Sequence, residues 1–158
     1  MVVVFRGAAL RACAALAVVL LAACSSRAPQ TPEEVVKAYL TAWKNHDYYT
    51  AYPLLTPYMQ QDLSREAWST QQDAITKVAD VQIFSFEVFP ARIDGDKAVV
   101  PNLLKSKDKY INQLGKNEYE LYTVLRSKDD GKWRIDKQEL VESDGVAKWF
   151  PESAREDR

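Results

Sequence analysis

The spacing of apolar residues changes from a helical period to a strand period near residue 81, and this change constrains the fold more than any other feature. Before it, apolar residues follow the i, i+3, i+4, i+7 stripe of an amphipathic helix, formed by Val36, Tyr39, Leu40 and Trp43. After it, apolar and polar residues alternate, as in "FSFEV" at 84–88, which is typical of half-buried strands. Helices followed by strands predict an α+β fold, with helices packed on one face of an antiparallel sheet.

Three helix starts are marked by capping residues. Thr31-Pro32-Glu33-Glu34 combines a cap, a proline at the first helical position and a glutamate three residues after the cap, which is the capping box. Asp47 is expected to cap a second helical stretch that reaches Leu55 and contains Pro53, and Ser64 a third helix. The third helix has Trp68 and Ile75 one heptad apart, which predicts that both face the core.

The strands are punctuated by turn residues. Asp94-Gly95 predicts a hairpin, and further strands are expected over 98–104, 118–125 and 133–140, with a polar loop at 105–109. Phe84, Phe86 and Val88 share one face of the first strand by alternation. After the last strand, Val146, Trp149 and Phe150 predict a final docked turn that Pro151 ends.

The first 23 residues have the pattern of a secretory signal. Arg6 and Arg11 give a positive start, and the apolar run that follows is shorter than the roughly 20 residues that span a bilayer. Leu21-Ala22-Ala23-Cys24 then resembles the lipobox of bacterial lipoproteins. That resemblance implies a diacylglycerol on the Cys24 sulfur, cleavage before this residue and acylation of the new N-terminus.

This resemblance sets the expected organisation of the chain. Residues 1–23 form the signal peptide, 24–30 a lipidated tether, 31–142 one domain and 143–158 a polar C-terminal tail. Two or more acyl chains anchor a protein stably. The expected location is therefore the bacterial cell envelope, namely the outer membrane of a Gram-negative cell, which Ser25 after Cys24 favours, or otherwise the outer face of the plasma membrane.

Charge and cysteine content exclude several classes of function. Without the two signal arginines, 19 basic and 22 acidic residues leave a net charge of −3, which gives no electrostatic footprint for nucleic acid. The remaining Cys24 has no disulfide partner, because Cys13 lies in the signal. No spacing of ligands predicts a metal site or a cofactor.

The order of elements resembles the nuclear transport factor 2-like (NTF2-like) superfamily, in which N-terminal helices fold over a strongly curved, cone-shaped sheet. Three stretches carry the resemblance: "TPEEVVKAYLTAWKNHDYYTAYPLL", "DGDKAVVP" and "YELYTVLRSKDDGKWRID". Within the superfamily, the chain is most like small lipoprotein domains of unknown function and the non-catalytic N-terminal extension of some penicillin-binding proteins. Pro53 departs from the pattern of the second helix.

Catalytic motifs are weak throughout. The single histidine, His46, lies in a polar break, and Ser106-Lys107-Asp108-Lys109 matches a serine–lysine motif only formally, in a charged segment. The superfamily includes isomerases that bury an acid and a tyrosine in the cone. Here Glu87 and Glu120 are the strand acids, with Tyr39, Tyr52 and Tyr122 as neighbours, and we expect these glutamates to face solvent and the tyrosines to fill the core.

Three functions follow from this sequence. The first is a non-enzymatic, membrane-anchored lipoprotein whose domain binds an apolar ligand, a glycan or an envelope protein, with a pocket lined by Tyr39, Trp43, Phe86 and Tyr122. The second is an isomerase or dehydratase that uses a buried carboxylate, a reading that fails if every acid points outward. The third is a structural or assembly subunit, including a homodimer over the open sheet face or a contact through exposed Trp149 and Phe150.

Overall fold

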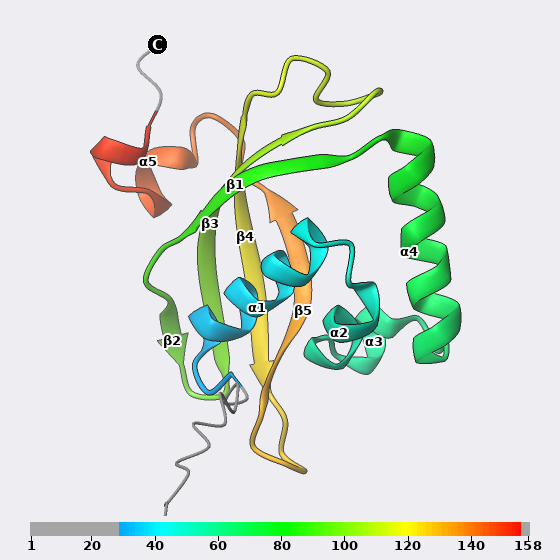
Figure 1. Ribbon diagram of the computed structural model, residues 1–158. Helices are drawn as coiled ribbons and strands as arrows, with labels where there is room; N and C mark the ends of the chain where they lie inside the picture. Colours follow the sequence, from blue (N-terminus) through cyan, green and yellow to red (C-terminus); the bar gives the residue numbers. More distant parts are fainter. Residues whose placement is uncertain (1–28, 156–158) are drawn as a thin grey trace, which may run out of the picture.

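The computed structural model describes residues 29–155 (Figure 1), so the signal segment and the predicted lipidation site Cys24 lie outside the described residues. Helical segments come first: α1 (Pro32–Lys44), α2 (Tyr48–Ala51), η1 (Tyr52–Leu54), α3 (Pro57–Gln60) and α4 (Arg65–Ala79). The strands follow: β1 (Gln82–Val88), β2 (Arg92–Asp94), β3 (Lys97–Lys107), β4 (Asn117–Arg126) and β5 (Trp133–Leu140). Two short turns, α5 (Val146–Trp149) and η2 (Glu152–Ala154), end the described chain. No helix within residues 29–155 is long and apolar enough to cross a bilayer.

The sheet is antiparallel in the order β1-β3-β4-β5, with β2 paired to the lower part of β3. It curves strongly around α1, which lies in its concave face (Figure 1). This arrangement confirms the predicted α+β class with helices on one face of a curved sheet. The inward residues of α1 and of β3 to β5 form the main core, with Val36, Ala51, Leu55, Val100, Val124 and Ile135 almost fully buried.

The predicted helix starts are confirmed. Thr31 accepts from the backbone N–H of Glu34 and the Glu34 side chain returns to the cap, while Asp47 and Ser64 cap α2 and α4. The second helical stretch is broken as Pro53 suggested: α2 gives way to the 3₁₀ turn η1. Leu55 then forms a parallel bridge with Ile135, which ties this segment to β5.

Several finer predictions were wrong. Ile75 does not face the core, since it is 51% exposed while Trp68 is buried, because α4 packs at the side of the molecule and buries little of its length. Phe84 does not share a face with Phe86, because the β1–β3 register shifts between Ile83 and Ser85 and leaves Phe84 outside. The predicted polar loop at 105–109 is partly strand, since β3 continues to Lys107.

The C-terminal turn packs on the outer face of the sheet, opposite α1. Phe150 is buried and contacts the rings of Phe89 and Tyr119 edge to face, with centroids 5.5 and 5.0 Å apart. The Tyr119 hydroxyl donates to the Ala154 carbonyl at 3.0 Å. The docked turn is therefore confirmed, while an exposed contact surface that includes Phe150 is not, because this ring lies in a second small core.

Candidate functional site

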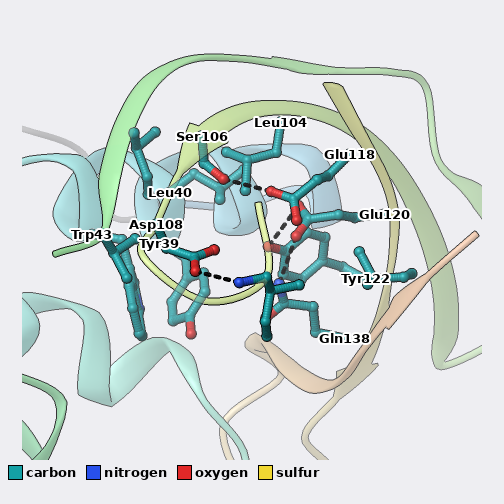
Figure 2. A pocket seen from close by; sticks show the side chains of 14 residues that line it. Tyr39, Leu40, Trp43, Leu104, Ser106, Asp108, Glu118, Glu120, Tyr122 and Gln138 are labelled. Atoms are coloured by element: carbon teal, nitrogen blue, oxygen red, sulfur yellow. Dashed lines mark hydrogen bonds between the residues drawn. The ribbon is translucent and has the colours of Figure 1, made fainter. Parts of the chain in front are cut away.

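A cavity of about 290 Å³ opens at the end of the cone where β3 and β4 meet the β3–β4 loop. Its walls come from α1, from the start of β1 and from the inward face of β3, β4 and β5 (Figure 2). The apolar and aromatic part of the lining consists of Tyr39, Leu40, Trp43, Val81, Ile83, Leu104, Ile111, Tyr122 and Leu140. The polar part consists of Ser106, Asp108, Glu118, Glu120 and Gln138. The volume lies near the lower end of the roughly 300–1,000 Å³ of small-molecule sites.

Glu120 lies at the centre of the polar wall. Side chains alternate along β4, so Glu118, Glu120, Tyr122 and Val124 point into the cone while Tyr119 points out. Glu120 is 2% exposed, which shows that the expectation of a solvent-facing Glu120 was wrong, whereas Glu87 is exposed as expected. The physical reason is that the outer face of β4 is itself apolar where the C-terminal turn covers it, so the more polar row lies inside.

Three donors hold the Glu120 carboxylate (Figure 2 shows those of Tyr122 and Gln138). Asn102 Nδ2 and the Tyr122 hydroxyl donate to Oε2, at 2.8 and 3.2 Å, and Gln138 Nε2 donates to Oε1 at 2.7 Å. Asn102 is the direct cross-strand partner of Glu120 on β3, and Gln138 comes from β5. Since a carboxylate oxygen has two acceptor positions, Oε1 keeps one position beyond Gln138.

Burial dominates the electrostatics of this group. It raises the pKa of Glu120 above its ordinary value, hydrogen bonds from Asn102, Gln138 and Tyr122 oppose that rise, and the nearby charge of Glu118 adds to it. Burial likewise raises the pKa of the Tyr122 and Tyr39 hydroxyls. Both tyrosines therefore stay protonated across the physiological range and remain donors.

Two further carboxylates line the cavity nearer its mouth. Glu118 accepts from the Ser106 hydroxyl across the β3–β4 pair. Asp108 accepts from the backbone N–H groups of Tyr110, Ile111 and Asn112, and these bonds lower its pKa. Among the described residues that line the cavity there is no lysine, arginine or histidine, so its acid–base side chains, apart from the tyrosines, are the carboxyl groups of Asp108, Glu118 and Glu120. Residues 29–155 contain no cluster of three or more His, Cys, Asp or Glu side chains placed to hold a metal.

Three of the four residues predicted to line a pocket do line this cavity, and one does not. Tyr39, Trp43 and Tyr122 lie among the lining residues, with the Tyr39 ring 5.9 Å from Trp43 and 6.2 Å from Tyr122. Phe86 lies outside the lining and packs against the main core, farther along β1 than Ile83, which takes the wall position. The sequence patterns did not predict Glu118, Asn102 or Gln138 as site residues, and Ser106 was considered only as part of the formal serine–lysine motif. The signal these four residues share is polarity at inward strand positions.

The histidine, the serine–lysine motif and Tyr52 form no catalytic arrangement at this cavity. His46 is exposed at the turn after α1, and its Nδ1 is 3.1 Å from the Tyr48 hydroxyl. Ser106 is on β3 and buried, while Lys109 is exposed beyond the strand, so the formal serine–lysine motif forms no pair. Tyr52 donates to the Leu63 carbonyl, packs against Trp68 and does not line the cavity.

Comparisons with known proteins identify the fold. No protein-family model matches the chain, and no curated protein sequence matches it. Among solved structures, an NTF2-like protein from Cytophaga hutchinsonii superimposes with a TM-score of 0.50 at 19% identity, over 68% of this chain and 92% of that one. A SEC-C motif containing protein from Rhodopseudomonas palustris gives 0.53 at 12% identity, over 71% and 80%.

A domain of unknown function with a cystatin-like fold from Nostoc punctiforme gives a TM-score of 0.51 at 12% identity, over 69% of this chain and 73% of that one. At these identities the likeness concerns the fold alone. The chain therefore has an NTF2-like fold, and its chemistry must be argued from its own residues.

Proposed function

We propose that this protein is a lipid-anchored protein of the bacterial envelope whose cone binds a small, mainly apolar ligand through the carboxylate of Glu120. The lipobox-like Leu21–Cys24 segment supports the anchor. The observation that carries the binding proposal is the cavity itself, in which aromatic and aliphatic walls surround a buried carboxylate with one open acceptor position. This combination of an apolar cavity and a few convergent polar groups is the usual form of a small-molecule site.

The charge of the lining indicates the chemical class of the ligand. Asp108, Glu118 and Glu120 are its acidic groups, and Tyr39, Trp43 and Tyr122 offer aromatic faces. A ligand with an apolar body and a donor group, such as an amine, fits this lining, because the amine can donate to Glu120 Oε1 and its charge is attracted by the rings. A carboxylate of the same size would lie beside three acidic groups and no basic one, so its burial should cost more than that of the amine.

A matched pair of probes tests this proposal. 2-Phenylethylamine and phenylacetate have similar apolar bodies and opposite charges, and binding of each is followed by NMR shifts of the cavity backbone. We expect the amine to bind at least about tenfold more tightly, a difference of about 1.4 kcal/mol. Equal affinities, or a preference for the acid, would contradict the proposal.

Three variants make the test specific. Glu120→Gln is expected to remove the preference for the amine. Leu140→Trp is expected to weaken both probes by filling the mouth, since Leu140 lines the cavity and is 62% exposed. Ile93→Trp is the matched control, because Ile93 is similarly exposed on β2 and lies outside the lining, and it is expected to change neither affinity.

The anchor is tested separately from the cavity. Mass spectrometry of the mature protein should show acylation at Cys24, and Cys24→Ser should move the protein from the membrane fraction to the soluble or unprocessed fraction. An unmodified thiol at Cys24, or unchanged membrane partition of the variant, would remove the anchor from the proposal and leave the ligand site untouched.

An enzyme of the isomerase or dehydratase kind is the second candidate, and the inward position of Glu120 favours it, since an acid buried beside two tyrosines suits proton transfer. The three donors on its oxygens reduce its basicity and support binding as the first candidate. Mass spectrometry of a bound ligand after incubation separates the two: conversion that Glu120→Gln abolishes would establish the enzyme.

A further inference from the structure

The β3–β4 loop, residues 108–116, presents large apolar side chains to solvent at the mouth of the cavity. Ile111 is 85% exposed, Leu114 is 82% exposed and Tyr110 is 64% exposed. Exposed apolar side chains are ordinary when scattered, but three within five residues at the tip of one loop form a local patch. We call these three residues the apolar tip.

The loop is held in shape by its polar groups and does not depend on burial of the tip. Asp108 binds three backbone N–H groups at the start of the loop, and the buried Asn112 donates to the carbonyls of Ser106 and Lys116, at 3.0 and 2.8 Å. Lys116 N–H donates back to Asn112 Oδ1 at 2.8 Å. The loop conformation itself therefore keeps the apolar tip exposed.

The charge around the tip is opposite to that of the chain. The segment 105–116, "KSKDKYINQLGK", contains four lysines and one acid, whereas the chain without its signal arginines has a net charge of −3. The four lysines are exposed, and the acid is Asp108, whose carboxylate is occupied by backbone donors. Apolar side chains surrounded by lysines match the interface of an anionic bilayer, where the lipid headgroups attract the lysines and the apolar side chains leave water.

The predicted tether joins the domain at the end of the sheet opposite the β3–β4 loop (Figure 1). α1 starts where Glu33 accepts from the Ala91 backbone and ends where Lys44 donates to the Phe84 carbonyl, so it runs toward the end of the sheet that carries the loop. Its 13 residues span about 20 Å. An extended tether over residues 24–30 reaches about 25 Å at most, whereas the 11 residues of β3 alone span about 36 Å. The loop and the acyl chains at Cys24 therefore reach one bilayer together when the sheet lies along its surface.

From these observations we infer that the apolar tip of the β3–β4 loop inserts into the surface of an anionic lipid bilayer. Ile111 belongs both to the tip and to the cavity lining, so this contact places the cavity mouth at the membrane surface. The inference rests on the loop and not on the ligand proposed for the cavity.

The test places an environment-sensitive fluorophore on Leu114→Cys and, as a reference, on Lys128→Cys in the β4–β5 turn at the other end of the sheet. The acylated chain is reconstituted into vesicles of phosphatidylcholine and phosphatidylglycerol with quencher-bearing lipids. We expect a blue shift and a loss of fluorescence at residue 114 but not at residue 128. Ile111→Ser in the same chain should reverse the loss, whereas Tyr58→Ser, which changes an exposed tyrosine on α3, should not.

Each other outcome decides against the inference. If the vesicle-bound protein shows no quenching at residue 114, or equal quenching at residues 114 and 128, the tip does not insert. If residue 114 is shielded only after envelope proteins are added, the partner is a protein and not a lipid surface. If Cys24 proves unmodified, the same fluorophores are placed on the Cys24→Ser chain, and millimolar lipid is added to measure insertion by the loop alone. Absence of quenching at residue 114 in that experiment overturns the inference and does not bear on the anchor.

Discussion

The two ends of the cone are built from the same strands and differ in the polarity of the side chains that face inward. At the apolar end, the inward residues are Ala98, Val100, Val124 and Ile135, each 0% exposed. At the polar end, the same strands add five polar inward residues, Asn102, Ser106, Glu118, Glu120 and Gln138, beside the apolar Leu104 and Leu140. The alternation of side chains is continuous along β3 and β4, and on β5 a register shift between Ile135 and Lys137 keeps Ile135 and Gln138 on the same face. The change of polarity therefore marks the site.

The comparison separates what stabilises the domain from what it can do. Dry packing at the apolar end contributes roughly 25 cal/mol for each Å² of apolar surface removed from water. At the polar end, burial works against the ionised form of Glu120, as its raised pKa shows, and its three donors offset only part of that cost. A group kept in this state at a cavity wall is a candidate for function.

The largest effect is expected at the apolar end. Ile135→Ala should lower the free energy of unfolding by about 3–4 kcal/mol, because Ile135 is fully buried between α1, β4 and the Leu55 segment, and the cavity it leaves cannot easily collapse. Urea unfolding followed by circular dichroism measures this change. A loss below about 1 kcal/mol would show that this end is loosely packed and would remove the contrast between the two ends.

Glu120→Ala is expected to cost less, about 2–3 kcal/mol, by leaving the buried donors of Asn102 and Tyr122 without an acceptor. The cost should be nearly absent in Glu120→Gln. There the Asn102 amide can turn so that its Oδ1, which has no partner among the described residues, accepts from the new amide. Equal destabilisation by the two variants would contradict this account.

Comparison of Glu120→Gln with the parent protein also tests the titration of Glu120. Its pKa in the folded protein is above the ordinary value of 4.5, so between these two values the folded state binds more protons than the unfolded state. Stability must then fall as pH rises through that window and level off above the folded pKa. Glu120→Gln should lack this fall, so the unfolding free energy of the variant should gain on that of the parent protein from about pH 4 toward neutrality.

The sequence alone was enough to predict the elements, because their signals are local. Thr31, Asp47 and Ser64 are caps that act within three residues, and Asp94-Gly95 specifies a hairpin without help from the rest of the chain. Alternation on β4 was equally visible. It could not show which row faces inward, because both rows contain large apolar residues and the choice depends on distant partners.

Those partners explain why Glu120 was misplaced. Two of its three donors, Asn102 and Gln138, come from β3 and β5, at a sequence separation of 18 residues in each direction, and no local pattern links them to it. The other row of β4 side chains, which includes Tyr119, faces the outer side of the sheet, where Phe150 packs on the Tyr119 ring. In the same way, the register shift beside Phe84 depends on how β1 pairs with β3 and cannot be inferred from β1 alone.

The smallest expected effect tests the difference between the two ends most directly, because the two variants remove one hydroxyl at one end of β3 and add one at the other. Ser106→Ala should cost about 1 kcal/mol or less, because it removes one hydrogen bond to a half-buried Glu118 that water at the cavity mouth can replace. Ala98→Ser adds the same hydroxyl on the same face at the apolar end and should cost more, about 1–3 kcal/mol, because Ala98 is fully buried among apolar neighbours. Unfolding in urea measures both, and the order of the two costs is the result that matters. If Ser106→Ala costs more than Ala98→Ser, the polar end is the better packed of the two, and the assignment of stability to one end and function to the other is wrong.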